Sequence, residues 1–174
     1  MKSCLSAMAK YNKQVNQTIR EIVRGVAHES LEVDAGTFFH SIKGTLEHIA
    51  LAELLWLRRF SSFGKYACLE NNRYLVSEPG KVEKEIVEKT ENCLAILEDL
   101  DELLFKLIGE LSEEALQSVV RYKNTKGDAF EKIYYQTILH ILVHGIHHQG
   151  ELSAIMDILK IKNDYSGFTS YKYD

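Results

Sequence analysis

Four of the chain's seven histidines, His140, His144, His147 and His148, fall within nine residues. The apolar residues around them repeat at helical spacing, and at about 100° per residue all four imidazoles share one face of a helix. Such a face usually carries Leu, Ile or Val, so imidazoles there leave polar nitrogens that need partners. A metal ion would supply one, because two histidines four positions apart lie one turn apart and can hold the same ion.

The spacing His-x-x-x-His is not specific by itself, since it also occurs on solvated or hydrogen-bonded helix faces. A metal site needs a third ligand from elsewhere in the chain. His48 lies in the middle of another segment with helical periodicity, where Gly44 and Ala52 leave space and Leu51 and Leu55 are apolar. A roomy apolar site with one polar group is how a ligand pocket begins. Taken alone, His48 is interpreted as a hydrogen-bonded core histidine.

Helical periodicity predicts an all-α chain with four long helices, at about residues 4–26, 37–60, 80–109 and 133–159. Helices of roughly 23 to 28 residues, about 35 to 42 Å long, indicate a four-helix bundle. The 174 residues fit one domain, residues 1–174, with a core that needs no metal to be stable. Sites in such bundles are built from facing helices. His48 and the pair His144 and His148 lie near the middles of their predicted helices, so they could meet at one level.

The stretch before the last helix departs from helical periodicity. Residues 118–123 resemble a short strand, Asn124-Thr-Lys-Gly127 a turn, and Asp128 to Glu131 a returning strand. The alternative is a capping box, Asp128-x-x-Glu131, that opens the helix early. We favour the β-hairpin.

Charge and composition exclude some partners. The net charge is −4, the pI is near 6.0 and no basic run is present, which disfavours nucleic-acid binding. Apolar runs fall short of the roughly 20 residues that a membrane span needs, and no signal peptide is recognised. Cys4, Cys68 and Cys93 are scattered thiols that suit a reducing compartment. We therefore expect a cytoplasmic protein with no membrane or nucleic-acid partner.

Three stretches carry a resemblance to a known family. They are Tyr11-Asn12; Phe38-Phe39-x-Ser41-Ile42-x-Gly44-Thr45-Leu46-x-His48-Ile49 followed by Trp56-Leu57-x-Arg59-Phe60; and His140-x-x-x-His144-x-x-His147-His148-x-Gly150. Together they resemble the DinB-like (DinB/YfiT-type, damage-inducible) metal-binding four-helix proteins, over nearly the whole chain. Outside this resemblance, Tyr11-Asn12 is interpreted as a tyrosine at a packed edge beside a solvated asparagine.

The resemblance implies that His48, His144 and His148 bind one divalent ion. Zinc or nickel is the usual ion, with manganese and iron as alternatives. The chain departs from the commonest pattern at Gln149, where arginine is frequent, and at Glu151, where glutamine is frequent. A contact made by that arginine would be lost here.

Glu151, His140 and His147 are neighbours of these ligands, and each has two alternative roles. Glu151 falls on the same helix face and could hydrogen-bond a ligand imidazole or coordinate the ion; the alternative is a surface glutamate. His140 and His147 border the expected pocket, where they could relay protons or serve as structural histidines.

Three imidazoles leave a fourth position of a tetrahedral ion open, as catalytic sites do. The expected function is a metal-dependent enzyme that activates a nucleophile against a small electrophilic substrate. That nucleophile is water, as in a hydrolase, or a low-molecular-weight thiol, as in a thiol S-transferase; the resemblance favours the thiol cosubstrate and implies a homodimer. The alternative is a non-catalytic, stress-associated metal-binding protein in which the ion is structural.

Overall fold

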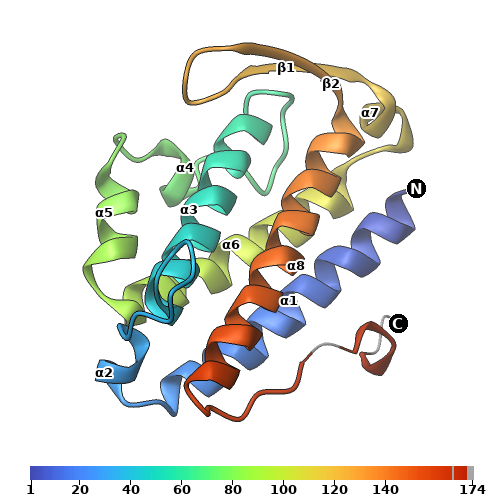
Figure 1. Cartoon of the computed structure of the whole chain (residues 1–174). Coiled ribbons are helices and arrows are strands. Elements are labelled where there is room, and N and C mark those ends of the chain that lie inside the picture. The colour runs from blue at the N-terminus through green and yellow to red at the C-terminus, as the bar shows by residue number, and fades with distance from the viewer. Residues whose placement is uncertain (166, 172–174) are drawn as a thin grey trace.

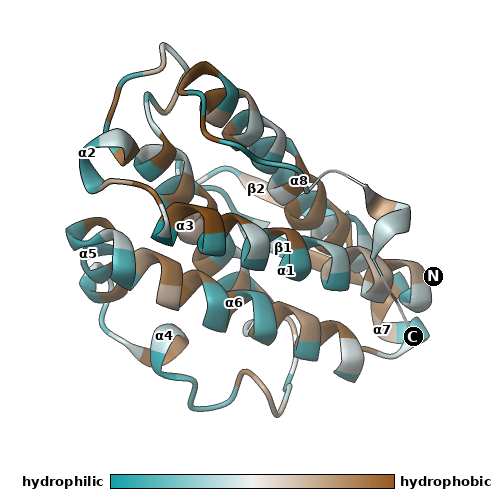
Figure 2. Ribbon diagram, turned by 90° about the horizontal axis from the view of Figure 1, so that it is seen from below, coloured by the Kyte–Doolittle hydropathy of each residue, from teal (hydrophilic) through white to brown (hydrophobic). Residues whose placement is uncertain are grey.

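The computed structural model describes residues 1–165 and 167–171, in which the long helices form a bundle (Figure 1). They are α1 (Lys2–Arg24), α3 (Ile42–Phe60), α6 (Thr90–Glu110) and α8 (Tyr134–Ile158). Apolar and polar residues alternate along α3 and α6 (Figure 2), as helices with one buried side require. Among the described residues, no helix is long and apolar enough to cross a membrane. The predicted all-α bundle is confirmed.

A two-stranded antiparallel hairpin, β1 (Val119–Lys123) and β2 (Ala129–Ile133), precedes α8 and lies across one end of the bundle (Figure 1). Asn124 builds its turn by accepting hydrogen bonds from the backbone N–H groups of Lys126 and Asp128, both at 2.9 Å. The hairpin is confirmed over the capping box. The remaining short elements are α2 (His28–Leu31), α4 (Arg73–Val76), α5 (Lys81–Glu88), α7 (Glu113–Gln117) and the 3₁₀ turn η1 (Phe168–Ser170).

Helix α3 begins at Ile42, later than predicted. His40 has a φ of +66°, which a right-handed helix does not permit, and Ser41 is extended and caps the helix by accepting from Gly44 N at 3.1 Å. The loop before α3 folds back so closely that a Cβ on Gly44 would lie 2.2 Å from the carbonyl oxygen of Phe39. The glycine therefore lets Phe39 approach α3.

The third predicted helix is two helices, α5 and α6, because Lys89 between them is extended, with φ −145° and ψ 141°. The prediction of one continuous helix is wrong. The buried positions Ile86, Thr90 and Leu94 keep a four-residue spacing across the break, so periodicity carries no sign of it.

One ion pair lies inside the core and joins α1 to α6. Arg20 donates to Asp101 Oδ2 at 2.8 Å, and Asn16 donates to Asp101 Oδ1 at 2.7 Å. The side chains of Arg20 and Asp101 are only 2% and 3% exposed, whereas Glu98, 3.8 Å from Arg20, is exposed. A buried charge without its partner is strongly destabilising, so Asp101 fixes how α1 lies on α6.

Removing the carboxylate of Asp101 should destabilise the folded protein. We expect Asp101→Ala to lower the free energy of unfolding by about 3 to 5 kcal/mol, because the buried Arg20 and Asn16 lose the carboxylate to which both donate. The matched variant Glu98→Ala should change it by less than about 0.5 kcal/mol, since it removes an exposed charge. Urea denaturation measures both, and equal losses in the two variants would contradict this account of the pair.

Candidate metal centre

Three histidines converge where α3 and α8 pack together. His48 Nε2 lies 3.0 Å from His144 Nε2, and the His148 ring centroid lies 4.6 Å and 4.5 Å from those of His48 and His144. One nitrogen from each ring lies within 4.8 Å of the other two. A tetrahedral ion with bonds of roughly 2.1 Å holds its ligand atoms about 3.4 Å apart. The three residues therefore fit one ion after small side-chain rotations.

The protonation of the cluster also suits a metal, which binds neutral imidazole. Burial, followed by the neighbouring His148 and His48, lowers the pKa of His144 to about 4. Burial, followed by His148, also lowers the pKa of His48. Since the folded pKa of His144 lies below its ordinary value, its contribution to stability is present above about pH 6.5 and is lost as the pH falls through the folded pKa.

Glu151 contacts one of the three rings. Its Oε2 lies 2.8 Å from His148 Nδ1, and both side chains are largely buried. A carboxylate there holds the proton on Nδ1 and leaves Nε2 free to coordinate. Glu151 is thus placed to orient His148, the first of the two roles considered from the sequence.

Phe39 covers the cluster, a contact that reasoning on the residues did not foresee. Its ring stacks on His48 with centroids 3.9 Å apart and planes 18° apart, and meets His148 edge-on at 5.4 Å. The folded-back loop before α3 makes this contact possible. Phe39 limits rotation of His48 and removes water from one side of the site.

The two remaining histidines of α8 lie beside the cluster and outside the group that could share an ion. The His140 ring is 6.3 Å from that of His144 and packs against Trp56 at 5.1 Å. His147 is exposed, with its ring 4.9 Å from that of His148. Both border the site, as expected from the sequence.

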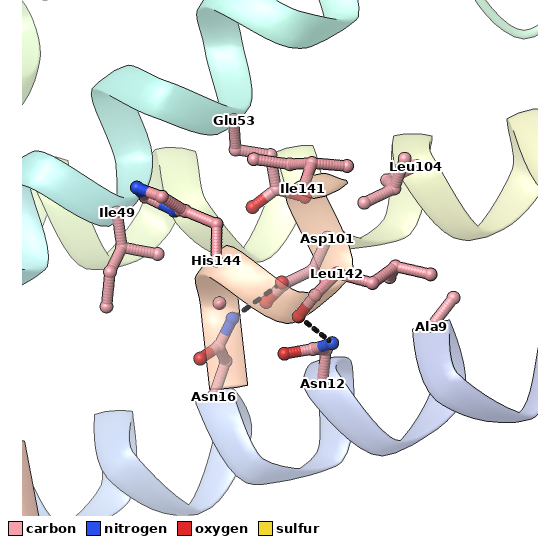
Figure 3. A pocket seen from close by; sticks show the side chains of 11 residues that line it. Ala9, Asn12, Asn16, Ile49, Glu53, Asp101, Leu104, Ile141, Leu142 and His144 are labelled. Atoms are coloured by element: carbon pink, nitrogen blue, oxygen red, sulfur yellow. Dashed lines mark hydrogen bonds between the residues drawn. The ribbon is translucent and has the colours of Figure 1, made fainter. Parts of the chain in front are cut away.

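A buried polar cluster underlies His144 (Figure 3). A cavity of about 20 Å³, room for about one water molecule, lies between Asn12, Asn16, Glu53, Asp101 and His144. His144 Nδ1 is buried and has no hydrogen-bond partner among the described residues. Polar groups therefore lie behind the candidate ligand His144.

Burial governs the two carboxyl groups of this cluster. It raises the pKa of Glu53 well above its ordinary value, and the charge of Asp101 adds to that shift. Burial also raises the pKa of Asp101 to about 7, against the opposing effects of Arg20 and Asn16. One guanidinium lies near two buried carboxyl groups, so the charged form of each carboxyl group disfavours that of the other.

Asn12 and Gln149 link α1 to α8 within the same cluster. Asn12 is 6% exposed and donates to the Leu142 carbonyl at 3.0 Å, so its interpretation as a solvated asparagine is wrong. Gln149 donates to Asn12 Oδ1 and Asn16 Oδ1, each at 2.9 Å. A Cβ on Gly145 would lie 2.7 Å from Asn12 Oδ1, so glycine is required for this approach. Gln149 thus fixes α8, which carries the candidate ligands His144 and His148, against α1.

Comparisons with known proteins agree with these features. A model of the DinB family matches residues 1–159. The chain is 21% identical to "Protein DinB" of Bacillus subtilis (strain 168) over 150 residues, which cover 83% of this chain and 77% of that protein. No solved structure gives a significant match.

Loss of any one converging histidine should weaken metal binding. We expect His48→Ala, His144→Ala and His148→Ala each to lower zinc affinity by more than the roughly 10- to 100-fold that follows loss of an outer partner. His147→Ala, an exposed histidine beside His148, should leave the affinity unchanged. Competition against a chromogenic chelator measures this, and a ligand variant with wild-type affinity would remove that residue from the site.

Glu151→Ala should lower zinc affinity by about 10- to 100-fold while keeping one ion per chain, because His148 loses the acceptor that orients its ring. Glu114→Ala, an exposed glutamate on α7, is the control and should have no effect. Unchanged affinity in Glu151→Ala would show that the glutamate is only a surface residue.

Proposed function

We propose that this chain, which belongs to the DinB family, is a metalloenzyme whose divalent ion is held by His48, His144 and His148. The observation that carries the proposal is the convergence of these imidazoles, from two helices, within 4.8 Å of one another. Imidazole suits zinc and nickel, with iron and manganese as alternatives.

The proposed activity is attack of a small thiol, or of water, on a small electrophilic substrate. A divalent ion in this site would lower the pKa of a coordinated thiol or water and so supply a nucleophile near neutral pH. Among the described residues the cluster offers three donors, and a catalytic site keeps its fourth position open where a structural site closes it. His48 and His144 are only partly buried, which supports access from outside.

The chain's own residues prepare this site. Low pKa values keep His48 and His144 neutral, so their lone pairs are available. Glu151 orients His148, and Phe39 stacks on His48 and shields that side from water. Fixed donors in a partly dry site need little reorganisation when charge develops there.

A second candidate function is non-catalytic, with the ion tying α3 to α8 as a structural cross-link. The origin of the ligands on two separate helices favours it. The resemblance to the family also implies a homodimer, for which Val143 and Ile146, exposed apolar side chains of α8, are suitable surface.

The two functions differ in whether an outside molecule reaches the ion. We expect the visible absorption bands of the Co²⁺-loaded protein to shift on addition of azide or of a small thiol such as cysteine, because one position is exchangeable. Ser3→Ala, an exposed change on α1, serves as the control and should respond as the wild type does. A spectrum that no added ligand changes, together with a melting temperature that falls on chelation, would favour the structural function and overturn the catalytic one.

A further inference from the structure

A second, larger cavity of about 340 Å³ opens beside the histidine cluster, between α3, α8 and the hairpin. It is lined by Trp56, Tyr122, Lys132, Gln136, Thr137 and His140. Its volume lies at the lower end of the range of small-molecule sites. Nothing in the proposed metal chemistry uses this space.

The register of the hairpin determines which of its side chains face the cavity. Val120 pairs with Lys132, and Tyr122 pairs with Phe130. Alternate residues of a strand point to the same face, so these four side chains share one face. Val120 is buried, which identifies that face as the one turned toward the bundle. Tyr122 lies on this face, and so does Lys132, which is exposed and lines the cavity at its solvent side.

Three of the six lining side chains are aromatic, and Trp56 contacts the other two, Tyr122 and His140. The Trp56 ring lies 5.2 Å from that of Tyr122 and 5.1 Å from that of His140. The Arg59 guanidinium lies over both Trp56 and Tyr122, at 4.6 Å and 5.1 Å, and donates to the Lys123 carbonyl at 3.2 Å. Arg59 thereby joins α3 to the hairpin, and a flat apolar group would meet preformed surfaces.

The charge of the cavity is positive. Lys132 lines it, Arg59 supports its wall, and the described lining residues include no carboxylate. An anionic ligand would therefore gain a charge-assisted contact without repulsion from the walls. A cationic ligand of the same shape would meet only like charge.

The residues that line the cavity are neighbours of the candidate metal ligands along both helices. On α3, His48, Ala52 and Trp56 follow at four-residue spacing, so they lie on one side of the helix. The small Ala52 side chain separates the histidine from the tryptophan. On α8, His140 contacts Trp56 and has its ring 6.3 Å from that of His144.

We infer that this cavity binds the body of the substrate, and that the substrate class is a small carboxylate with a planar apolar group. Lys132 holds the carboxylate, Trp56 and Tyr122 contact the planar group, and the reactive end lies toward His144. This inference rests on the proposed function, because the cavity matters as a substrate site only beside a working metal centre.

Trp56 makes the inference directly measurable, because it is the chain's single tryptophan and forms a wall of the cavity. The experiment follows its fluorescence in metal-free full-length protein during titration with benzoate, benzamide and benzylammonium. These probes have similar shape and differ in charge. We expect saturable quenching by benzoate, binding of benzamide roughly tenfold weaker, and no saturation with benzylammonium.

Two lysine variants separate the cavity from general charge effects. Lys132→Met should weaken benzoate binding about tenfold and bring it to the level of benzamide. Lys126→Met, an exposed change in the hairpin turn, should bind benzoate as the wild type does. Equal binding of benzoate and benzamide by the wild type, equal effects of both variants, or no saturation with benzoate would overturn the inference.

The metal-free protein keeps this test separate from the proposed function. Failure of benzoate binding in a protein that takes up one zinc ion would overturn the substrate site and leave the metal centre standing. Normal benzoate binding in a protein that takes up no zinc would instead overturn the proposed function.

Discussion

The contact between α3 and α8 is the constraint on which the rest of the molecule depends, because it buries polar imidazole nitrogens where packing would favour apolar groups. His48 and His144 bring two Nε2 atoms within 3.0 Å of each other. Burial lowers both pKa values, so repulsion is avoided by keeping the rings neutral. Two lone pairs so arranged need a shared proton or a shared cation. A divalent ion would satisfy them together with His148.

The other helices hold this contact in register. Gln149 is joined to Asn12 and Asn16 of α1, and Asn16 continues to Asp101 of α6. Buried hydrogen bonds of this kind, from Gln149 to Asn12 and Asn16, make one packing of the helices more favourable than its neighbours. Buried polar contacts, as well as the apolar core, therefore set the position of α8. They thereby set the distance of His144 and His148 from His48 on α3. The hairpin lies across the end of the bundle where α8 begins and contributes Tyr122 and Lys132 to the cavity beside the site.

Much of this could be predicted from the sequence, because it follows from local periodicity. The four long helices, the hairpin and the common face of His144 and His148 all have short-range signals. The break at Lys89 has none, since the apolar spacing runs through it. The buried roles of Asn12 and Gln149 depend on contacts between distant segments, and the stacking of Phe39 on His48 depends on the folded-back loop before α3. Glu53 left a usable trace, because it is a carboxylate within the apolar stretch from Ile49 to Leu57, whereas Asp101 stands among Asp99 and Glu102 and left none.

The central claim is that three imidazoles separated along the chain share one ion. X-ray absorption at the zinc edge of protein loaded with one equivalent tests it most directly. The account predicts three imidazole nitrogens at about 2.0 to 2.1 Å with one further light ligand, and two imidazoles in His48→Ala. A first shell with fewer than three imidazoles in the wild type, or one unchanged by His48→Ala, would contradict it.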